Sequence, residues 1–172
     1  CAQSMIEHFH PDWVLNLGVA GAGEEGVSIG DMVIATGAVQ HDMDTSAVGD
    51  PVGMISGLNI IHIPADATLA KLAEKAASHQ DFPCLKGTVA SGDQFVSTAP
   101  QKERIRSLFH AIACEMEGAA IGHVCYINSV PFTVLRTISD NADDSSGMDY
   151  SAFLPLAISR SFLILSDVIR QL

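Results

Sequence analysis

The chain has 172 residues, 48% of which are hydrophobic, and a formal net charge of −11 at pH 7. This length is typical of one domain with a packed core, and we expect residues 1–172 to form a single domain. The acidic balance argues against nucleic acid and anionic membranes as partners, because both favour clustered Lys and Arg.

Cysteine usage and the absence of a leader pattern indicate an ordinary cytoplasmic protein. The four cysteines include no C-x-x-C pair, so neither a zinc site of that type nor a disulfide framework is expected. No signal peptide is visible. The apolar segment 153–165 is interrupted by Arg160 and is too short and too polar to span a bilayer.

The first third of the chain predicts a helix, two strands and a long loop. Apolar residues within 5–9 have helical spacing, so we expect the sequence to begin inside a helix. Residues 13–17 predict a buried strand that ends at Gly18, and residues 31–35 predict a second strand. Residues 41–64 are rich in Gly, Pro, Asp and Ser, which predicts a long loop of functional importance.

The remaining two thirds alternate helices with short apolar strands. The expected helices are 66–78, 100–109, 116–128 and 151–172, and the expected strands are 85–91, 111–114 and 131–138. Strands that are apolar on both faces are typical of a parallel sheet covered by helices. The sequence therefore predicts an α/β fold, a three-layer α/β/α sandwich with a mixed, largely parallel central sheet.

A glycine-rich segment from Gly21 to Gly26 fits the dinucleotide-binding pattern G-x-G-x-x-G. That pattern requires a helix next, whereas residues 27–35 are typical of a strand. A tight turn whose backbone approaches a ligand is the better interpretation. No P-loop lysine follows the glycines.

His41, Asp42 and Asp44 are residue types that can bind a metal. On an extended segment, His41 would lie on one side and the two aspartates on the other. A polar loop is the favoured interpretation, and we expect neither a metal nor a cofactor.

Two glutamates, Glu115 and Glu117, lie where a predicted strand passes into an apolar helix. Positions two apart do not share a helix face. A purely structural explanation is that a carboxylate is electrostatically favourable at a helix start. The functional explanation is that one carboxylate binds ligand hydroxyls at the carboxyl end of the sheet, where open α/β sheets bind ligands.

Two other predicted strand ends carry candidate site residues. Residues 136–141 end a core strand in Ser139 and Asp140, where a partly buried carboxyl group can act as a general acid. Residues 91–96 include Phe95 beside backbone groups that can bind the edge of a purine. The structural alternatives are that Asp140 caps a turn and that Phe95 belongs to the core.

These segments, taken in order, resemble the 5′-methylthioadenosine/S-adenosylhomocysteine nucleosidases of the purine nucleoside phosphorylase superfamily. The matching segments are 16–21, 30–33, 41–42, 91–95, 115–117 and 136–140. The resemblance implies hydrolysis of the N-glycosidic bond of a purine nucleoside, with release of adenine in methionine salvage. It also implies a homodimer in which Thr45 and Val48 line the partner subunit's pocket. A purine nucleoside phosphorylase and a futalosine hydrolase are the alternatives.

The resemblance implies a role for each site residue. Asp140 would protonate N7 of adenine, and Glu117 would bind the ribose hydroxyls, oriented by Arg136. Phe95 would stack on the base, whereas Glu115 would support the site from behind. The substrate-binding set would comprise Gly21, Phe95, Val96, Met116, Glu117, Arg136, Ser139 and Tyr150.

Two departures from the family pattern concern the nucleophile. Asn16 and Val19 stand where related phosphorylases bind phosphate with Arg and Ser, which favours water over phosphate. The family's first strand and the glutamate-rich turn that supplies the water-activating base have no counterpart, so we expect the sequence to lack the family's N-terminal part. Glu24 and Glu25 are poor substitutes for that base. The non-enzymatic alternative is therefore a domain that binds adenine nucleosides without turnover.

Overall fold

The computed structural model describes residues 1–143 and 146–172, with the backbone alone described for residues 146–149. The helices are α1 (Ala2–Phe9), α2 (Ala67–Ala77), α3 (Ala99–Phe109), α4 (Gly118–Ile127) and α5 (Ser146–Gln171), and η1 (Ser46–Val48) is a short 3₁₀ helix. The strands are β1 (Val14–Ala22), β2 (Met32–Gln40), β3 (Ile63–Pro64), β4 (Cys84–Ser91), β5 (Ala111–Glu115) and β6 (Phe132–Asp140).

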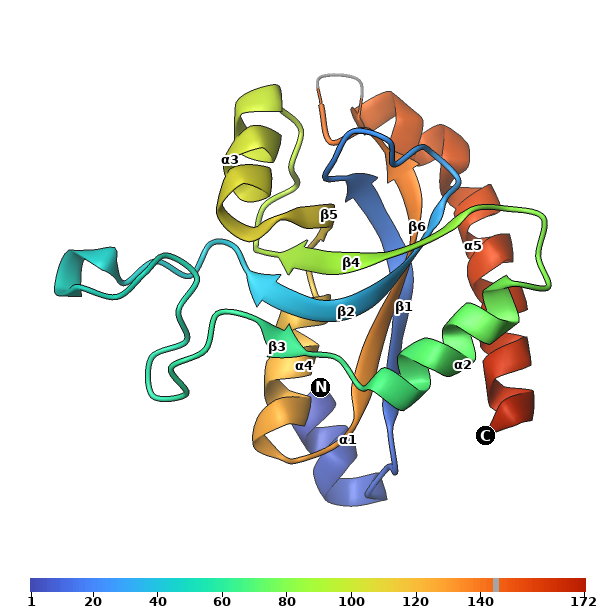
Figure 1. Ribbon diagram of the computed structural model, residues 1–172, viewed down its shortest axis with the longest axis horizontal. Helices are drawn as coiled ribbons and strands as arrows, with labels where there is room; N and C mark the ends of the chain where they lie inside the picture. The colour runs from blue at the N-terminus through green and yellow to red at the C-terminus, as the bar shows by residue number, and fades with distance from the viewer. Residues whose placement is uncertain (144–145) are drawn as a thin grey trace.

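The six strands form one mixed sheet in the order β3-β2-β4-β5-β1-β6 (Figure 1). The longer pairings, β1–β6, β2–β4 and β4–β5, are parallel, and the short pairings β1–β5, β2–β3 and β2–β6 are antiparallel. The predicted mixed, largely parallel sheet is therefore confirmed. The β2–β6 pairing also bends the sheet until it closes on itself, which the local sequence pattern did not indicate.

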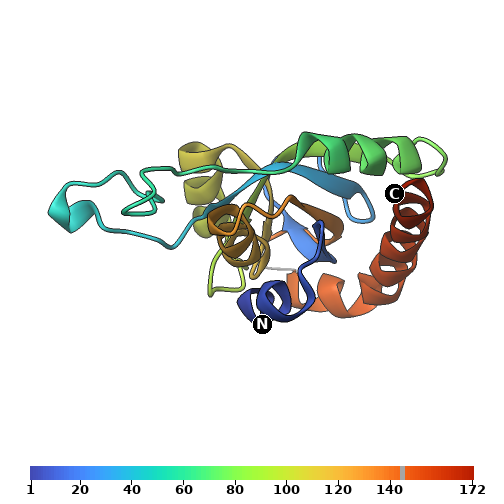
Figure 2. The same ribbon diagram turned by 90° about the horizontal axis from the view of Figure 1, so that it is seen from below.

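Helices cover the sheet from both sides, which confirms the α/β/α sandwich (Figure 2). α2 and α5 pack together over a cluster that includes Met32 and Ile34, whereas Val33 belongs to the cluster under α1 and α4. The alternation along β2 follows from the two-residue period of a strand. α3 packs on β4 and β5 through Ile105 and Phe109.

β1 is longer than the sequence pattern predicts, because it continues through Gly18 and Gly21 to Ala22. These glycines therefore lie in a strand, and the tight turn comes after them. A Cβ at Gly18 would lie 3.1 Å from the guanidinium of Arg136, and one at Gly21 would lie 2.7 Å from a carboxylate oxygen of Asp140. Glycine is needed here because charged side chains of β6 lie directly against β1.

The other predicted elements are present with shifted ends. Asp66, the first residue of the predicted helix, is the N-cap of α2, since its carboxylate accepts the Leu69 N–H at 2.8 Å. α4 begins two residues later than predicted and is buried on one face only, because Tyr126 and Ile127 are exposed. The long loop after β2 projects away from the sheet and carries η1 at its tip (Figure 1).

α5 is much longer than the apolar segment 153–165 noted in the sequence. By length and composition alone, its segment Tyr150–Gln171 is long and apolar enough to cross a membrane, the one such helix in the described part of the chain. A helix that covers the core of a globular protein satisfies the same criterion. In this fold α5 packs lengthwise on β1, β6 and α2.

Leu135 tests the packing of the sheet, because its side chain is fully buried in β6. Leu135→Ala is expected to lower the free energy of unfolding by about 2–5 kcal/mol, since it leaves a cavity between packed layers. Urea denaturation measures the change. Ile127→Ala, at a position 55% exposed, is the control and should change stability by about 0.5 kcal/mol or less. Equal losses in both variants would contradict the core assignment.

Candidate active site

A cavity of about 360 Å³ opens where β1 and β6 end and α4 begins. This volume is in the range of small-molecule sites. Seven of the predicted substrate-binding or catalytic residues line it: Gly21, Phe95, Met116, Glu117, Ser139, Asp140 and Tyr150. The other lining residues are Gly18, Val19, Ala20, Cys114 and Glu115. Segments far apart in the sequence thus converge at one edge of the sheet, as their strand-end positions predicted.

Asp140 is held at the end of β6 by hydrogen bonds to both of its carboxylate oxygens. Oδ1 accepts the Ala142 N–H at 2.9 Å, and Oδ2 accepts the Ser139 hydroxyl at 2.9 Å. The residue is only 2% exposed, although it lines the cavity. Both neighbours donate to the carboxyl group and so fix its position and orientation at the edge of the cavity.

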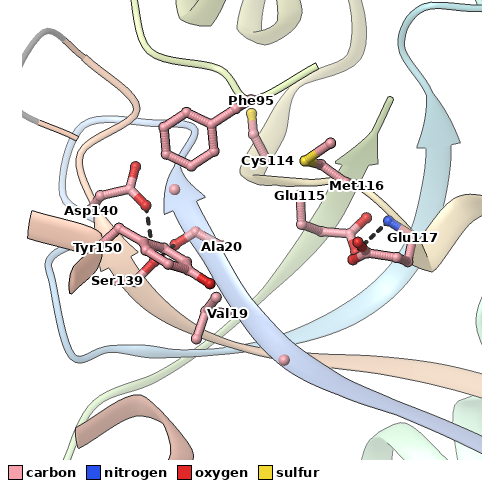
Figure 3. Close-up of a pocket in the computed structure, with 12 residues that line it drawn as sticks. Val19, Ala20, Phe95, Cys114, Glu115, Met116, Glu117, Ser139, Asp140 and Tyr150 are labelled. Atoms are coloured by element: carbon pink, nitrogen blue, oxygen red, sulfur yellow. Dashed lines mark hydrogen bonds between the residues drawn. The ribbon is translucent and has the colours of Figure 1, made fainter. Parts of the chain in front are cut away.

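Phe95 and Tyr150 form the aromatic wall of the cavity (Figure 3). Their rings are arranged edge to face, with centroids 6.2 Å apart and an interplanar angle of 87°. Phe95 is 47% exposed, so the alternative that it belongs to the core is wrong. The Val96 side chain is buried with Ile105 in the cluster under α3 and does not line the cavity, whereas the expected contact of the Val96 backbone with the edge of the base stays a prediction.

Glu115 has more hydrogen bonds than any other carboxylate lining the cavity. Its Oε1 accepts the Ser91 hydroxyl, and its Oε2 accepts Nε–H of Arg136 at 3.1 Å and an Nη2 proton of the same guanidinium. The backbone N–H groups of Glu117 and Gly118 also donate to Glu115, at 3.1 and 2.8 Å. The structural explanation from the sequence is thus correct for Glu115, which satisfies the positive end of α4.

Glu117 is the carboxylate of the pair that faces the opening, with a side chain 65% exposed. Arg136 Nη2 lies 3.7 Å from its Oε2, but the hydrogen bonds of Arg136 go to Glu115, Asn16 and the Leu135 carbonyl instead. The guanidinium therefore acts on Glu117 through charge at short range. Met116, 41% exposed, lies between the two glutamates and also lines the cavity.

The described lining of the cavity contains three carboxylates and neither Lys nor Arg. Arg136 lies behind it and is 1% exposed, with Asn16 Oδ1 accepting a proton from Nη2 at 2.5 Å. Val19 presents an apolar surface to the cavity. An anion such as phosphate would thus meet negative charge without a free cation.

His41 and Asp42 pack against the segment that leads to Phe95. Asp42 Oδ2 accepts the Asp93 N–H at 2.7 Å, and a Cβ at Gly92 would lie 2.5 Å from the His41 ring. These contacts agree with the interpretation of a polar structural segment. Among the described side chains, those of residues 1–143 and 150–172, no group of three or more His, Cys, Asp or Glu could hold a metal ion.

Thr45 and Val48 lie outside this cavity, on the projecting loop (Figure 1). The Thr45 hydroxyl donates to Asp50 at 2.9 Å, and Val48 is 83% exposed. Their predicted role in a partner subunit's pocket stays a prediction.

Sequence reasoning missed Ser91 and the part that Asn16 plays behind the site. Both lie in segments that carry the family resemblance, but neither is a charged residue at an obvious catalytic spacing. A serine that ends a strand with its hydroxyl toward a neighbouring helix start has no local sequence signature. Only the fold brings Ser91 and Glu115 together.

The chain belongs to the phosphorylase superfamily, whose sequence profile matches residues 1–170. An aminodeoxyfutalosine nucleosidase of Helicobacter pylori strain J99 is 42% identical over 169 residues, which are 98% of this chain and 73% of that protein. A 5′-methylthioadenosine/S-adenosylhomocysteine nucleosidase of Staphylococcus saprophyticus is 36% identical over 98% of this chain and 74% of that protein.

The fold agrees with that of solved structures. A 5′-methylthioadenosine/S-adenosylhomocysteine nucleosidase of Neisseria meningitidis, in complex with methylthio-immucillin-A, matches with a TM-score of 0.95 at 31% identity. The match covers 99% of this chain and 74% of that one. Within the superfamily, this chain is thus a member of the 5′-methylthioadenosine/S-adenosylhomocysteine nucleosidase family, as its motifs indicated.

Removing the charge of Glu115 tests the buried network. Glu115→Gln is expected to lower the free energy of unfolding by about 3–5 kcal/mol, because it leaves the buried Arg136 guanidinium without its counter-charge. The matched control is Glu103→Gln, which breaks an exposed pair with Arg106 and should cost about 1 kcal/mol or less. Urea denaturation separates the two, and similar losses would contradict the account of the network.

His41 predicts a pH dependence of stability. Burial lowers the pKa of His41 below its ordinary value, and its Nε2 is buried without a hydrogen-bond partner. Because the unfolded chain then binds the proton more readily, stability should fall as pH drops through about 6.5. His41→Phe should reduce this fall between about pH 7.5 and 5.5 in urea denaturation. The exposed His62→Gln should not, and an unchanged slope in His41→Phe would count against the assignment.

Proposed function

We propose that this chain hydrolyses the N-glycosidic bond of 5′-methylthioadenosine or S-adenosylhomocysteine and releases adenine. The observation that carries the proposal is the cavity in which Asp140, Glu117 and Phe95 meet. Support comes from relatives named for this activity at 36–37% identity. The arrangement offers an acid for the base, a carboxylate for the sugar and an aromatic face for stacking.

Asp140 acts on the leaving group. In its protonated form it donates to N7 of adenine, so that the electron pair of the breaking C1′–N9 bond moves into a base that leaves more readily. Ser139 and the Ala142 N–H hold the carboxyl group in place, and they stabilise the carboxylate that forms when its proton is given up.

Glu117 acts on the sugar. Its exposed carboxylate binds the ribose hydroxyls, and its charge favours the oxocarbenium-like cation that develops as the base departs. Glu115 compensates the positive charge of Arg136, so the three side chains together keep a net negative charge beside the sugar. Water then adds to C1′, and the proton that it loses returns by way of solvent to the Asp140 carboxylate, which restores the acid for the next turnover.

Water is favoured over phosphate as the nucleophile. The described lining has no cation to bind phosphate, and Asn16 and Val19 replace the Arg and Ser that the resemblance assigns to phosphorylases. Asn16 is uncharged, and its backbone and side-chain oxygens accept hydrogen bonds from Arg136, so it does not supply the positive charge that phosphate binding favours.

The described lining of the cavity offers no carboxylate that is left over to activate the attacking water. Within the described residues, the carboxylates that line the cavity are Glu115, Glu117 and Asp140, all of which have other tasks. Glu24 and Glu25 are exposed and outside the lining. The non-enzymatic alternative is that the chain binds adenine nucleosides without turnover.

We also propose that the protein is a cytoplasmic homodimer in which the projecting loop reaches the neighbouring subunit's site. The proposal is supported by Val48, a large apolar side chain left 83% exposed at the loop tip. The four free cysteines are compatible with a reducing compartment.

Asp140→Asn is expected to abolish adenine release while the chain stays folded, because the amide cannot deliver a proton to N7. A loss of about 10²-fold or more is expected from the removal of a general acid. Adenine release is followed by chromatography and folding by circular dichroism. The exposed Asp81→Asn is the control. Near-normal turnover in Asp140→Asn would remove Asp140 from this role.

A substrate series tests the nucleophile and the 5′ group. Adenine release from methylthioadenosine should be the same with and without phosphate, and strict dependence on phosphate would instead indicate a phosphorylase. Aminodeoxyfutalosine belongs in the series because relatives at 41–42% identity are named for it. Comparing kcat/KM for methylthioadenosine, S-adenosylhomocysteine and aminodeoxyfutalosine identifies the preferred 5′ group. Release of adenine from none of the three would support the binding-only alternative.

A further inference from the structure

We infer that Ser91 is a positioning residue that fixes the ribose-binding Glu117 relative to the base-stacking Phe95. The inference rests on the proposed function of the cavity. Ser91 does not line that cavity, and its side chain is 3% exposed at the end of β4. It therefore acts through the elements that it joins.

The Ser91 hydroxyl has two hydrogen bonds with a defined direction. Its oxygen accepts the Ala119 N–H at 2.6 Å, and its proton goes to Oε1 of Glu115. A backbone N–H can only donate and an ionised carboxylate can only accept, so the single hydroxyl proton has one possible orientation.

This hydroxyl completes the cap of α4. Glu117 is the residue at the N-cap position, but its side chain makes no capping hydrogen bond. The Gly118 N–H donates to Glu115 instead, and the next one, from Ala119, donates to Ser91. Because the cap comes from outside the helix, Glu117 is free to point toward the cavity. Loss of the hydroxyl would leave the fully buried Ala119 without a partner for its N–H.

Ser91 also holds the segment that carries Phe95. The Ser91 carbonyl accepts the His41 N–H at 2.9 Å, and the next residue, Gly92, donates its N–H to the Glu115 carbonyl at 3.2 Å. Phe95, which forms part of the aromatic wall of the cavity, follows a few residues further along this segment. One residue thus connects the start of the base-binding segment to the start of the helix that carries Glu117.

A nucleoside contacts both Phe95, through its base, and Glu117, through its ribose, so it depends on the position of one relative to the other. Free adenine contacts only the base-binding part. Loss of the Ser91 hydroxyl should therefore weaken nucleoside binding selectively. A general loss of structure would weaken both ligands, so the ratio of the two affinities separates positioning from a merely structural role.

The experiment measures dissociation constants for adenine and for methylthioadenosine by calorimetry, with Asp140→Asn as the background to prevent turnover. In Ser91→Ala the nucleoside is expected to bind about tenfold more weakly, the equivalent of one hydrogen bond. Adenine should bind within about twofold of the background. Ser91→Thr retains the hydroxyl and should restore nucleoside binding.

Ser161→Ala is the matched control. Ser161 is a buried serine, 7% exposed, whose hydroxyl lies 3.2 Å from that of Thr137. It does not line the cavity and has no hydrogen bond to Glu115, Glu117 or the segment that carries Phe95, so its loss should affect neither ligand. If Ser91→Ala does not fold, Ser91→Cys keeps the volume with weaker hydrogen bonds and should show the same selective loss in smaller measure.

A 2′,3′-dideoxy form of methylthioadenosine gives the sharpest readout. It lacks the hydroxyls that Glu117 binds, so Ser91→Ala should weaken its binding no more than that of adenine. Equal weakening of all three ligands, or none, would overturn the positioning role. If the protein with Asp140 intact binds neither adenine nor methylthioadenosine, the proposed function itself fails and the inference fails with it.

Discussion

The buried carboxylate of Glu115 is the interaction on which the rest of the site depends. It neutralises the Arg136 guanidinium and accepts N–H groups at the start of α4. A buried ion pair is stable only when its remaining hydrogen-bonding groups are satisfied, and here Ser91 and Asn16 complete the network. Because β4, β5, β6, β1 and α4 all contribute, this one network joins the elements that surround the cavity.

The network also explains how a site with three carboxylates remains folded. Glu115 and Arg136 compensate each other in the interior, while Glu117 keeps its charge at the opening and Asp140 is held by two donors. The uncompensated negative charge is thus that of Glu117, which lies beside the proposed sugar position and not in the core. Such a cavity suits a substrate that becomes cationic as its bond breaks and disfavours an incoming phosphate.

The sequence predicted the layers of the fold and most of the cavity, because apolar strands and polar strand ends are local patterns. Asp140 ends a strand, Phe95 and Glu117 come shortly after strands, and α/β sheets bind ligands at the carboxyl ends of their strands. The extension of β1 through Gly18 and Gly21 was missed, since glycine normally indicates a turn. Its explanation lies in the side chains of β6, which local patterns do not reveal. The closure of the sheet through β2 and β6 likewise joins distant segments.

A crystal structure of the chain with a non-hydrolysable methylthioadenosine analogue tests the central claim most directly. The account predicts N7 of the base at hydrogen-bond distance, about 2.6–3.2 Å, from the Asp140 carboxyl group. It also predicts the ribose hydroxyls on Glu117 and the base against Phe95. An analogue bound in another cavity, or bound here with its ribose away from Glu117, would contradict it.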